Sequence, residues 1–457
     1  MKTLLKGGQV VSGSGVAAAD VLLDGATIAA VGPDLCADGA EVVDCSGKLL
    51  FPGFIDAHTH FDLEVAGTIT ADDFTTGSRA ALRGGTTTVI DFAAPDKGES
   101  LQAGLRRWHQ KADGKTACDY AFHMTIDDWN EDISREIGEM VDAGIPSFKM
   151  YMTYPAMMIG EKDMYFALKR LKEVGALTGV HCENSGIIDA LIAEKKAAGE
   201  LSPASHPRTR PNGLEAEAVS HLLRLAEQVD TPVIIVHLST KESLEEVRAA
   251  RSRGQVVYVE TCPHYLLLED SVYDNPDFTE AAKYVCAPPI RTIADQEALW
   301  LALADGEIQT VSTDHCSFTT AQKRAGQYDF TKIPGGLPGV ETRGTLLYTA
   351  GVAEGRITAS DMCRVLSENP AKLYGCWPRK GVIAPGSDAD IVLYDPEADS
   401  VITAAGQIQN VDYNPYEGFE TKGSIAQVYL RGRLAVDHGT VLAGNDGQFI
   451  PRGKCCL

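Results

Sequence analysis

The chain alternates short apolar runs with stretches of helical periodicity, and this alternation constrains its fold more than any other feature. Eight runs of strand length recur between residues 54 and 313: Phe54–His60, Thr86–Ala93, Asp119–Met124, Ser147–Tyr151, Leu177–Cys182, Pro232–Leu238, Val256–Thr261 and Ile308–Thr313. Eight strands that are each followed by a helix fit an α/β fold of the (β/α)8 TIM-like barrel type better than an open doubly wound sheet.

One of the intervening stretches shows the helical spacing clearly. The apolar residues of 214–229 share one face of a helix: Val219, Leu222, Leu223, Ala226 and Val229. Ser239 is followed three residues later by Glu242, which is the spacing of a capping box. We therefore expect the next helix to begin at Ser239.

The two ends of the chain resemble each other and differ from the centre. Residues 2–50 hold short β-rich pieces between Gly and Asp turns, and 381–395 and 425–436 resume this style. Strands with close turn signals indicate antiparallel sheet. We expect one small β-sandwich built from both termini, with residues 1–52 as its first part, 53–375 as the barrel, and 376–457 as its second part and a C-terminal tail.

Charge and hydropathy exclude several classes of partner. The formal net charge is −22, which argues against a nucleic acid because phosphate binding needs clustered Lys and Arg. No apolar run approaches the roughly 18 residues that a membrane-spanning helix needs, and residues 1–11 lack the apolar core of a signal peptide. The 11 cysteines show no CxxC spacing and indicate reduced thiols. We expect a cytoplasmic protein.

Six polar residues stand at or near the carboxyl ends of the apolar runs, where barrel enzymes carry their chemistry: His58, His60, Lys149, His181, His237 and Asp314. His58 and His60 are two apart on a strand, so both side chains leave the same face. Four histidines and one aspartate exceed the needs of one tetrahedral site, which predicts two metal ions. The sequence alone leaves open whether Lys149 reaches solvent or a carboxylate, or is carboxylated by CO₂.

Several segments resemble the dihydropyrimidinase and D-hydantoinase family of the amidohydrolase superfamily. They are residues 51–92, SFKMYMTY around Lys149, VHCEN around His181, VHLST around His237, TCPHYL at 261–266, APPIR at 287–291, STDHCSF at 312–318 and GSDADIVLYDP at 386–396. The similarity covers nearly the whole chain, and every metal-ligand position of the family is filled.

The resemblance implies a role for each of these residues. His58, His60 and Asp314 would bind a first, more buried Zn²⁺, and His181 and His237 a second one. Lys149, as N6-carboxylysine, would bridge the two ions, which could also be another divalent metal. Tyr154 matches the family tyrosine that donates a hydrogen bond to the substrate carbonyl.

The resemblance also implies the reaction. A small-molecule cyclic amide, either a dihydropyrimidine or a 5-substituted hydantoin ring, would be opened to an N-carbamoyl amino acid by a hydroxide shared by the two metals. Asp314 would act as the base that moves a proton to the leaving ring nitrogen, and Tyr154 would stabilise the oxyanion. The family is usually homotetrameric, so we expect a homo-oligomer.

The substrate region departs from the family pattern at two positions. Ala287 stands where a serine is common, and Gly335 where an asparagine is common. The family holds the imide edge of the ring with main-chain atoms, so both positions stay substrate-binding candidates. Apolar residues beside the ligand motifs are candidates for the pocket of the ring substituent: Phe61, Leu63, Met157 and Met158.

Three other readings of the same motifs remain. An allantoinase-like ureide hydrolase shares the metal set. A dihydroorotase is disfavoured, because Asp62 occupies the place where those enzymes carry an arginine. A non-catalytic, dihydropyrimidinase-related assembly protein is disfavoured because such relatives have lost metal ligands.

Overall fold

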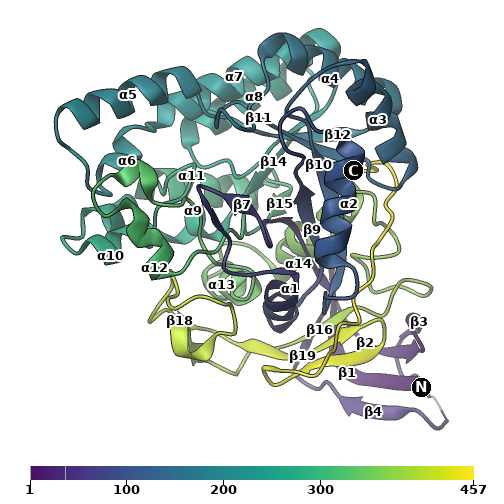
Figure 1. Ribbon diagram of the computed structural model, residues 1–457. Helices are drawn as coiled ribbons and strands as arrows, with labels where there is room; N and C mark the ends of the chain where they lie inside the picture. Colours follow the sequence, from purple (N-terminus) through teal and green to yellow (C-terminus); the bar gives the residue numbers. More distant parts are fainter. Residues whose placement is uncertain (1, 37) are drawn as a thin grey trace.

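A parallel sheet of eight strands forms the centre of the computed structural model, which describes residues 2–36 and 38–457 (Figure 1). The strand order is β15-β14-β13-β12-β11-β10-β9-β6. Its strands are β6 (Phe54–Thr59), β9 (Thr86–Ala93), β10 (Asp119–Thr125), β11 (Ser147–Tyr151), β12 (Leu177–His181), β13 (Val233–Ile235), β14 (Val257–Thr261) and β15 (Thr310–Val311). Each falls within, or within one residue of, one of the eight predicted runs.

The first and last strands of this sheet approach each other and nearly close it. The backbone N–H of His60 donates to the carbonyl of His315 at 2.8 Å, and that of His315 donates to the carbonyl of His58 at 3.3 Å. Thr59 and His315 form a parallel bridge. The prediction of a (β/α)8 barrel is therefore confirmed.

Helices alternate with the strands and cover the outside of the barrel (Figure 1). The longer ones are α1 (Phe74–Arg83), α2 (Leu101–Ala112), α3 (Glu131–Asp142), α4 (Glu161–Val174), α5 (Ser185–Ala197), α7 (Asn212–Val229), α8 (Lys241–Ser252) and α11 (Ile293–Ala304). The shorter ones are α6 (Ser205–Arg208), α9 (Pro263–Leu267), α10 (Phe278–Ala282), α12 (Thr320–Lys323), α13 (Arg343–Leu347), α14 (Ala359–Cys363) and α15 (Asn369–Leu373). The predicted apolar face of α7 is buried, as its spacing indicated.

The expected start of α8 at Ser239 is wrong. The helix begins at Lys241, and Thr240 caps it by accepting a hydrogen bond from the backbone N–H of Ser243 at 3.1 Å. Ser239 is fully buried and its hydroxyl donates to the carboxylate of Glu215 on α7. The hydroxyl of Ser239 therefore binds Glu215, which is distant in sequence, and does not cap α8 as the local pattern predicted.

Strands from both ends of the chain form one nine-stranded sheet, purple and yellow in Figure 1. They are β1 (Lys2–Ser12), β2 (Gly15–Asp24), β3 (Thr27–Gly32), β4 (Glu41–Asp44), β5 (Leu49–Pro52), β16 (Ile391–Asp395), β19 (Ser424–Leu430), β20 (Arg433–Asp437) and β21 (Thr440–Val441). β1 pairs with β4 along its first half and with β5 along its second, and its register shifts between Leu5 and Gly8.

This terminal sheet encloses a core of its own, which includes Leu5, Val21, Leu23, Ile391 and Leu393. The predicted small β-domain formed by both termini is confirmed, and its strands are hydrogen-bonded into one sheet that branches at β1. The boundaries at residues 52 and 375 stay predictions. Two short hairpins lie outside these sheets, β7 (Glu64–Val65) with β8 (Thr68–Ile69) and β17 (Ser400–Val401) with β18 (Glu420–Thr421).

The C-terminal segment packs against the amino-terminal ends of the barrel strands. The backbone N–H of Ile450 donates to the carbonyl of Tyr120, near the start of β10, at 2.8 Å. Arg452 is buried and donates to the hydroxyl of Ser147, the first residue of β11, at 2.8 Å. This end of the barrel is thus covered by protein. None of the helices in the described part of the chain has the length and apolar character needed to span a membrane.

Candidate metal centre

The six candidate ligands meet at the carboxyl-terminal end of the barrel. His58 lies in β6, Lys149 in β11, and His181 is the last residue of β12. The other three, His60, His237 and Asp314, stand in the turns that follow β6, β13 and β15. All six line one cavity of about 800 Å³. Residues that are up to 256 positions apart in the chain (58 to 314) therefore face a common space.

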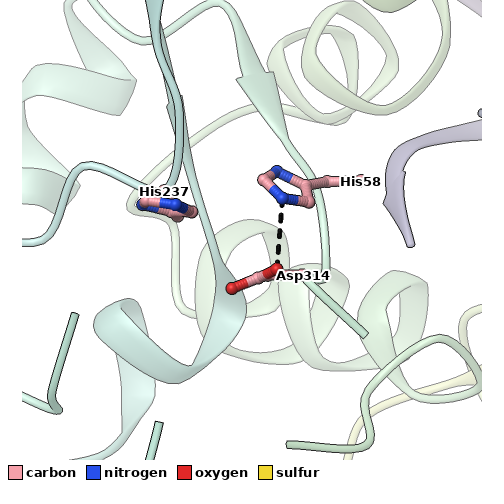
Figure 2. Close-up of side chains that lie close together, drawn as sticks. All are labelled: His58, His237 and Asp314. Carbon is pink, nitrogen blue, oxygen red and sulfur yellow. Dashed lines mark ion pairs between the residues drawn. The ribbon is translucent and has the colours of Figure 1, made fainter. Parts of the chain in front are cut away.

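Three of these residues converge on a single point. Potential ligand atoms of His58, His237 and Asp314 all lie within 4.8 Å of one another, as Figure 2 shows. His58 Nε2 is 3.1 Å from Asp314 Oδ1. This contact lacks hydrogen-bond geometry, so within the described residues both His58 Nε2 and His237 Nδ1 are buried without a hydrogen-bond partner. Buried nitrogens without partners cost free energy unless something else binds them, and a divalent cation is what such a donor set suits.

The remaining histidines complete two neighbouring groups of donors. His60 Nε2 lies 3.1 Å from Asp314 Oδ1 in hydrogen-bond geometry, and its ring centre is 5.2 Å from that of His58. The ring centres of His181 and His237 are 4.6 Å apart. These residues fit a metal centre with more donors than one ion needs.

Asp314 is ready to act as an anion at this point. Burial alone would raise the pKa of its carboxyl group, but the charge of His58 and the contacts from His58 and His60 hold that pKa well below the usual value. The backbone of Asp314 has a φ of +50°, which turns the side chain from the end of β15 toward the two histidines.

Lys149 is buried with its amine inside the barrel mouth. It is 1% exposed, and its Nζ lies 4.9 Å from the ring centre of Phe92 and 5.1 Å from that of Tyr151. Burial lowers the pKa of the amine to about 8, although the carboxylates of Asp314 and Glu260 act in the opposite direction. A larger fraction of this lysine is neutral near physiological pH than of an exposed one.

Glu260, near the carboxyl end of β14, orients His58 through the ring nitrogen Nδ1. Its Oε1 lies 2.6 Å from His58 Nδ1 and also accepts a hydrogen bond from the backbone N–H of His237 at 3.2 Å. The carboxylate is fully buried. When the imidazole is neutral, as a metal ligand must be, a hydrogen bond from Nδ1–H to this carboxylate leaves the Nε2 lone pair directed at the shared space.

Glu183 and Arg210 orient the imidazole of His181 in a similar way. His181 Nε2 lies 2.8 Å from Glu183 Oε2, which also accepts a hydrogen bond from Arg210 Nη1 at 2.6 Å. Burial opposes ionisation of Glu183, but the charge of Arg210 and the contact with His181 lower its pKa. Glu183 is therefore an anion that fixes the orientation of the imidazole.

Tyr154 lines the cavity beside His181 and Arg210. Its ring centre is 5.1 Å from that of His181 and 5.7 Å from the guanidinium carbon of Arg210. Burial raises the pKa of the phenol, so the hydroxyl keeps its proton and can donate a hydrogen bond. Its φ of +69° places it in the left-handed region, as for Asp314.

Ala287 and Gly335 line the same cavity. A Cβ atom added to Gly335 would lie 3.9 Å from the Cα of Cys286, so the two segments are neighbours. Of the apolar candidates, Leu63 and Met157 line the cavity. Phe61 instead packs in the core against Phe74, with ring centres 5.7 Å apart, and Met158 lies outside the lining.

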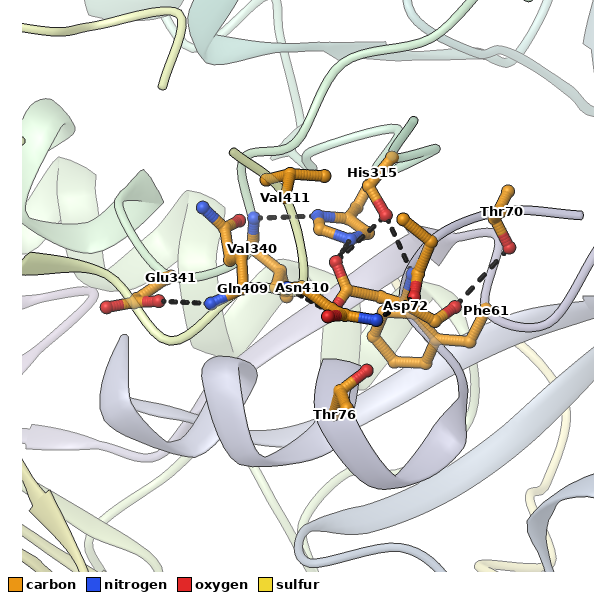
Figure 3. Close-up of polar contacts among 12 residues, drawn as sticks. Phe61, Thr70, Asp72, Thr76, His315, Val340, Glu341, Gln409, Asn410 and Val411 are labelled. Atoms are coloured by element: carbon orange, nitrogen blue, oxygen red, sulfur yellow. Dashed lines mark hydrogen bonds and ion pairs between the residues drawn. The ribbon is translucent and has the colours of Figure 1, made fainter. Parts of the chain in front are cut away.

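A buried histidine next to Asp314 holds the loops behind the site together (Figure 3). His315 Nε2 lies 3.0 Å from Asp72 Oδ2, and its Nδ1 accepts hydrogen bonds from the backbone N–H groups of Gly339 and Val340 at 3.1 and 3.3 Å. Asp72 also accepts from the backbone N–H of Asn410 at 2.9 Å. His315 and Asp72 thus fix the turn that carries Asp314.

Sequence reasoning assigned no role to Glu260, Glu183, Asp72 or His315. Two of them carried a usable signal, because Glu260 lies near the end of an apolar run and His315 adjoins Asp314. Glu183 stands two residues after His181, and Asp72 follows His60 by 12 residues with no motif between them that marks it. Their partners could not be identified without the fold.

Comparisons with known proteins agree with this geometry. The sequence profile of the amidohydrolase family matches residues 49–435. The chain is 42% identical over 458 residues to the D-hydantoinase of Geobacillus stearothermophilus, covering 99% of this chain and 97% of that protein. It is 41% identical to the D-phenylhydantoinase of Escherichia coli O127:H6, covering 99% and 98%.

Solved structures give the same result. The dihydropyrimidinase of Brevibacillus agri superposes with a TM-score of 0.98 at 41% identity, and all of both chains is covered. The L-hydantoinase of Arthrobacter aurescens superposes with a TM-score of 0.90 at 29% identity, covering 98% of this chain and 99% of that one. The chain therefore belongs to the amidohydrolase family, in the group that contains the D-hydantoinases and dihydropyrimidinases.

Proposed function

We propose that this protein hydrolyses a cyclic amide, a dihydropyrimidine or a 5-substituted hydantoin ring, to an N-carbamoyl amino acid at a centre of two divalent metal ions. The observation that carries the proposal is the single cavity lined by all the candidate ligands together with Tyr154, Ala287 and Gly335. The names of the relatives, D-hydantoinase and dihydropyrimidinase, support this substrate class.

His58, His60 and Asp314 would hold the first ion, and His181 and His237 the second. Their nitrogen and oxygen donors suit Zn²⁺, and another divalent cation of similar size would also fit. The unpartnered nitrogens of His58 and His237 support this assignment. When bound, the two cations act as Lewis acids and lower the pKa of water toward neutrality.

Lys149 would join the two groups of ligands as N6-carboxylysine. Its neutral amine attacks CO₂, an N–C bond forms, one proton leaves, and the side chain becomes an anion with two oxygen donors. An unmodified ammonium would be repelled by cations at this place. The burial of the amine and its pKa of about 8 raise the fraction of the neutral form that this addition requires.

The chain's own residues supply the proton transfers. Asp314 takes a proton from the attacking water as the new C–O bond forms at the ring carbonyl, and delivers it to the ring nitrogen as the C–N bond breaks. The Tyr154 hydroxyl donates a hydrogen bond to the oxygen that becomes negative. Main-chain groups near Ala287 and Gly335 hold the imide edge, and Leu63 and Met157 contact the ring substituent.

A substrate panel tests the proposal. Dihydrouracil, hydantoin, 5-phenylhydantoin, allantoin and dihydroorotate would be assayed by ring opening with enzyme prepared in Zn²⁺ and bicarbonate. We expect turnover of the dihydropyrimidine or the hydantoins, its loss with a chelator, and its return when Zn²⁺ is added. Exclusive turnover of allantoin would replace this function with a ureide hydrolase, and a metal-free protein inactive on all five would contradict it.

We also propose that the protein is a homotetramer in the cytoplasm. The oligomeric state rests on its family membership, and the compartment on its 11 free cysteines, which suit a reducing environment. Light scattering of the purified protein and fractionation of cells would test the two statements separately. A monomer, or recovery in a secreted fraction, would contradict them.

A further inference from the structure

Lys323, the last residue of α12, has its ammonium buried behind the cavity wall. The residue is 1% exposed. Its Nζ donates hydrogen bonds to three main-chain carbonyls, those of Val285 at 2.8 Å, Pro334 at 2.9 Å and Gly336 at 2.9 Å. An ammonium has three N–H donors, so these three hydrogen bonds to two stretches of backbone use all of them. Figure 1 shows α12 beside α10.

These two stretches, residues 285–287 and 334–336, form part of the cavity wall. Ala287, Gly335 and Gly336 line the cavity, whereas Lys323 does not. The stretches also contact each other directly, because the backbone N–H of Gly336 donates to the carbonyl of Val285 at 2.9 Å. Lys323 therefore does not contact the cavity itself, and it can affect the cavity only by holding the backbone of these two stretches in place.

Three buried carbonyls that converge on one point favour a cation at their centre. Their oxygens carry partial negative charge, and buried carbonyls without a donor cost free energy. The titratable groups near the ammonium are the thiols of Cys286 and Cys316 and the imidazole of His206. Burial raises the pKa values of the two thiols and lowers the pKa of His206 to about 3, so all three are neutral near neutral pH and supply no counter-charge. Burial lowers the pKa of Lys323 to about 7, and the carbonyl contacts favour the charged form against it.

We propose that Lys323 is a positioning residue that fixes the spacing between residues 285–287 and 334–336, and thereby the grip of these segments on the imide edge of the ring. The inference rests on the proposed function, since it concerns how that substrate is held. Lys323 takes no part in the bond-breaking steps and contacts no candidate metal ligand.

The loop after residue 334 is held at two places, which separates substrate positioning from metal binding. Lys323 holds its beginning at Pro334 and Gly336. His315, beside Asp314, holds its end at Gly339 and Val340. Loss of the ammonium therefore loosens the segment near the substrate edge, while the turn that carries Asp314 keeps its support.

The test compares Lys323→Met and Lys323→Arg with Lys332→Met, a control that removes an exposed charge from the turn just before residues 334–336. With the best hydantoin or dihydropyrimidine substrate, we expect Lys323→Met to raise KM by about tenfold or more, with kcat changed less than about threefold. Both metals should stay bound. Lys323→Arg should restore part of the affinity, because its planar donors keep the charge but cannot all converge on one point. The control should match the wild type.

Hydrogen exchange supplies a readout that does not depend on turnover. In Lys323→Met the amide of Gly336 should exchange faster, and the amides of Gly339 and Val340 should not. If the wild type opens none of the rings, the proposed function fails. The exchange rate of the Gly336 amide then still decides whether Lys323 holds the two segments. If Lys323→Met does not fold, Lys323→Arg carries the same comparison.

Two results would overturn the inference. The first is a folded, metal-loaded Lys323→Met, or Lys323→Arg where the Met variant does not fold, with KM within about twofold of the wild type and unchanged exchange at Gly336. The second is a loss of metal that accompanies the loss of affinity, because that would place Lys323 among the supports of the metal centre.

Discussion

Tyr154, His237 and Asp314 all have positive φ angles, at 69°, 38° and 50°, and all three line the cavity. Such angles are costly for residues other than glycine and persist where the surroundings over-determine them. For Asp314 the surroundings are visible, because His315 is held by Asp72 and by two backbone N–H groups. The strain at these residues is maintained by the loops around the cavity.

Glu260→Gln tests whether the carboxylate behind His58 matters to metal binding. The amide cannot act as the charged acceptor for His58 Nδ1, so we expect metal affinity to fall by about 10- to 100-fold with the fold retained. Titration of the metal-free protein with Zn²⁺, followed by calorimetry, measures this. Glu245→Gln on the exposed side of α8 is the matched control. An affinity equal to the wild type would show that Glu260 serves the core alone.

Tyr154→Phe removes the proposed donor to the oxyanion and little else. We expect kcat to fall by about 100- to 1,000-fold, as for the loss of one donor in comparable sites, with KM and metal content nearly unchanged. Steady-state kinetics with metal analysis checks this. Tyr165→Phe on α4 should have no effect. A fall in kcat of less than about threefold would remove Tyr154 from the mechanism.

The sequence could predict the candidate ligands because strand ends of a parallel barrel share one rim, and the structure brings all six there. It could not predict the residues that support them. Glu260 contacts His58 across 202 positions, and Asp72 contacts His315 across 243. A carboxylate of this kind looks like any other until the fold places its partner. Phe61 was misjudged for the same reason, since only packing shows that it faces the core.

At the scale of elements, periodicity predicted the strands well and helix starts less well. The run at 308–313 contains β15, which spans only Thr310–Val311 before the chain turns at Asp314. The capping pattern at Ser239 failed because Glu215 on α7 takes its hydroxyl. Local patterns therefore hold where no distant side chain competes for the same group.

A buried ion-pair cluster joins the barrel to the terminal sheet. Lys380 Nζ lies 2.7 Å from Asp119 at the start of β10, 2.6 Å from Asp390 beside β16, and 3.0 Å from Asp388. Arg431 also contacts Asp119. The three carboxylates are close enough to hold a cation, but three basic side chains already neutralise them, because Arg379 lies 3.0 Å from Asp388. We therefore assign this cluster to stability.

Lys380→Met should destabilise the protein strongly. It would leave buried carboxylates without their shared counter-charge, which costs about 3–5 kcal/mol in comparable buried pairs. Urea unfolding followed by circular dichroism measures the change. Lys422→Met, which breaks an exposed ion pair with Asp399, should leave the midpoint nearly unchanged. Equal midpoints for the two variants would show that the cluster does not hold the two parts together.

At the scale of the whole molecule, the two ends of the barrel have different surroundings. The carboxyl-terminal rim opens into the cavity with the candidate ligands. The opposite end is covered by the C-terminal segment, where Ile450 and Arg452 are buried against β10 and β11. Composition and charge could not show this arrangement, because the tail is short and its partners lie some 300 positions away, as Arg452 and Ser147 are 305 apart.

The measurement that tests the account most directly is a crystal structure with anomalous diffraction at the metal absorption edge, from protein grown with Zn²⁺ and bicarbonate. The account predicts two anomalous peaks, one beside His58, His60 and Asp314 and one beside His181 and His237, with carboxylate density beyond the Lys149 nitrogen. Peaks absent from this cavity, together with an unmodified Lys149 amine, would contradict it.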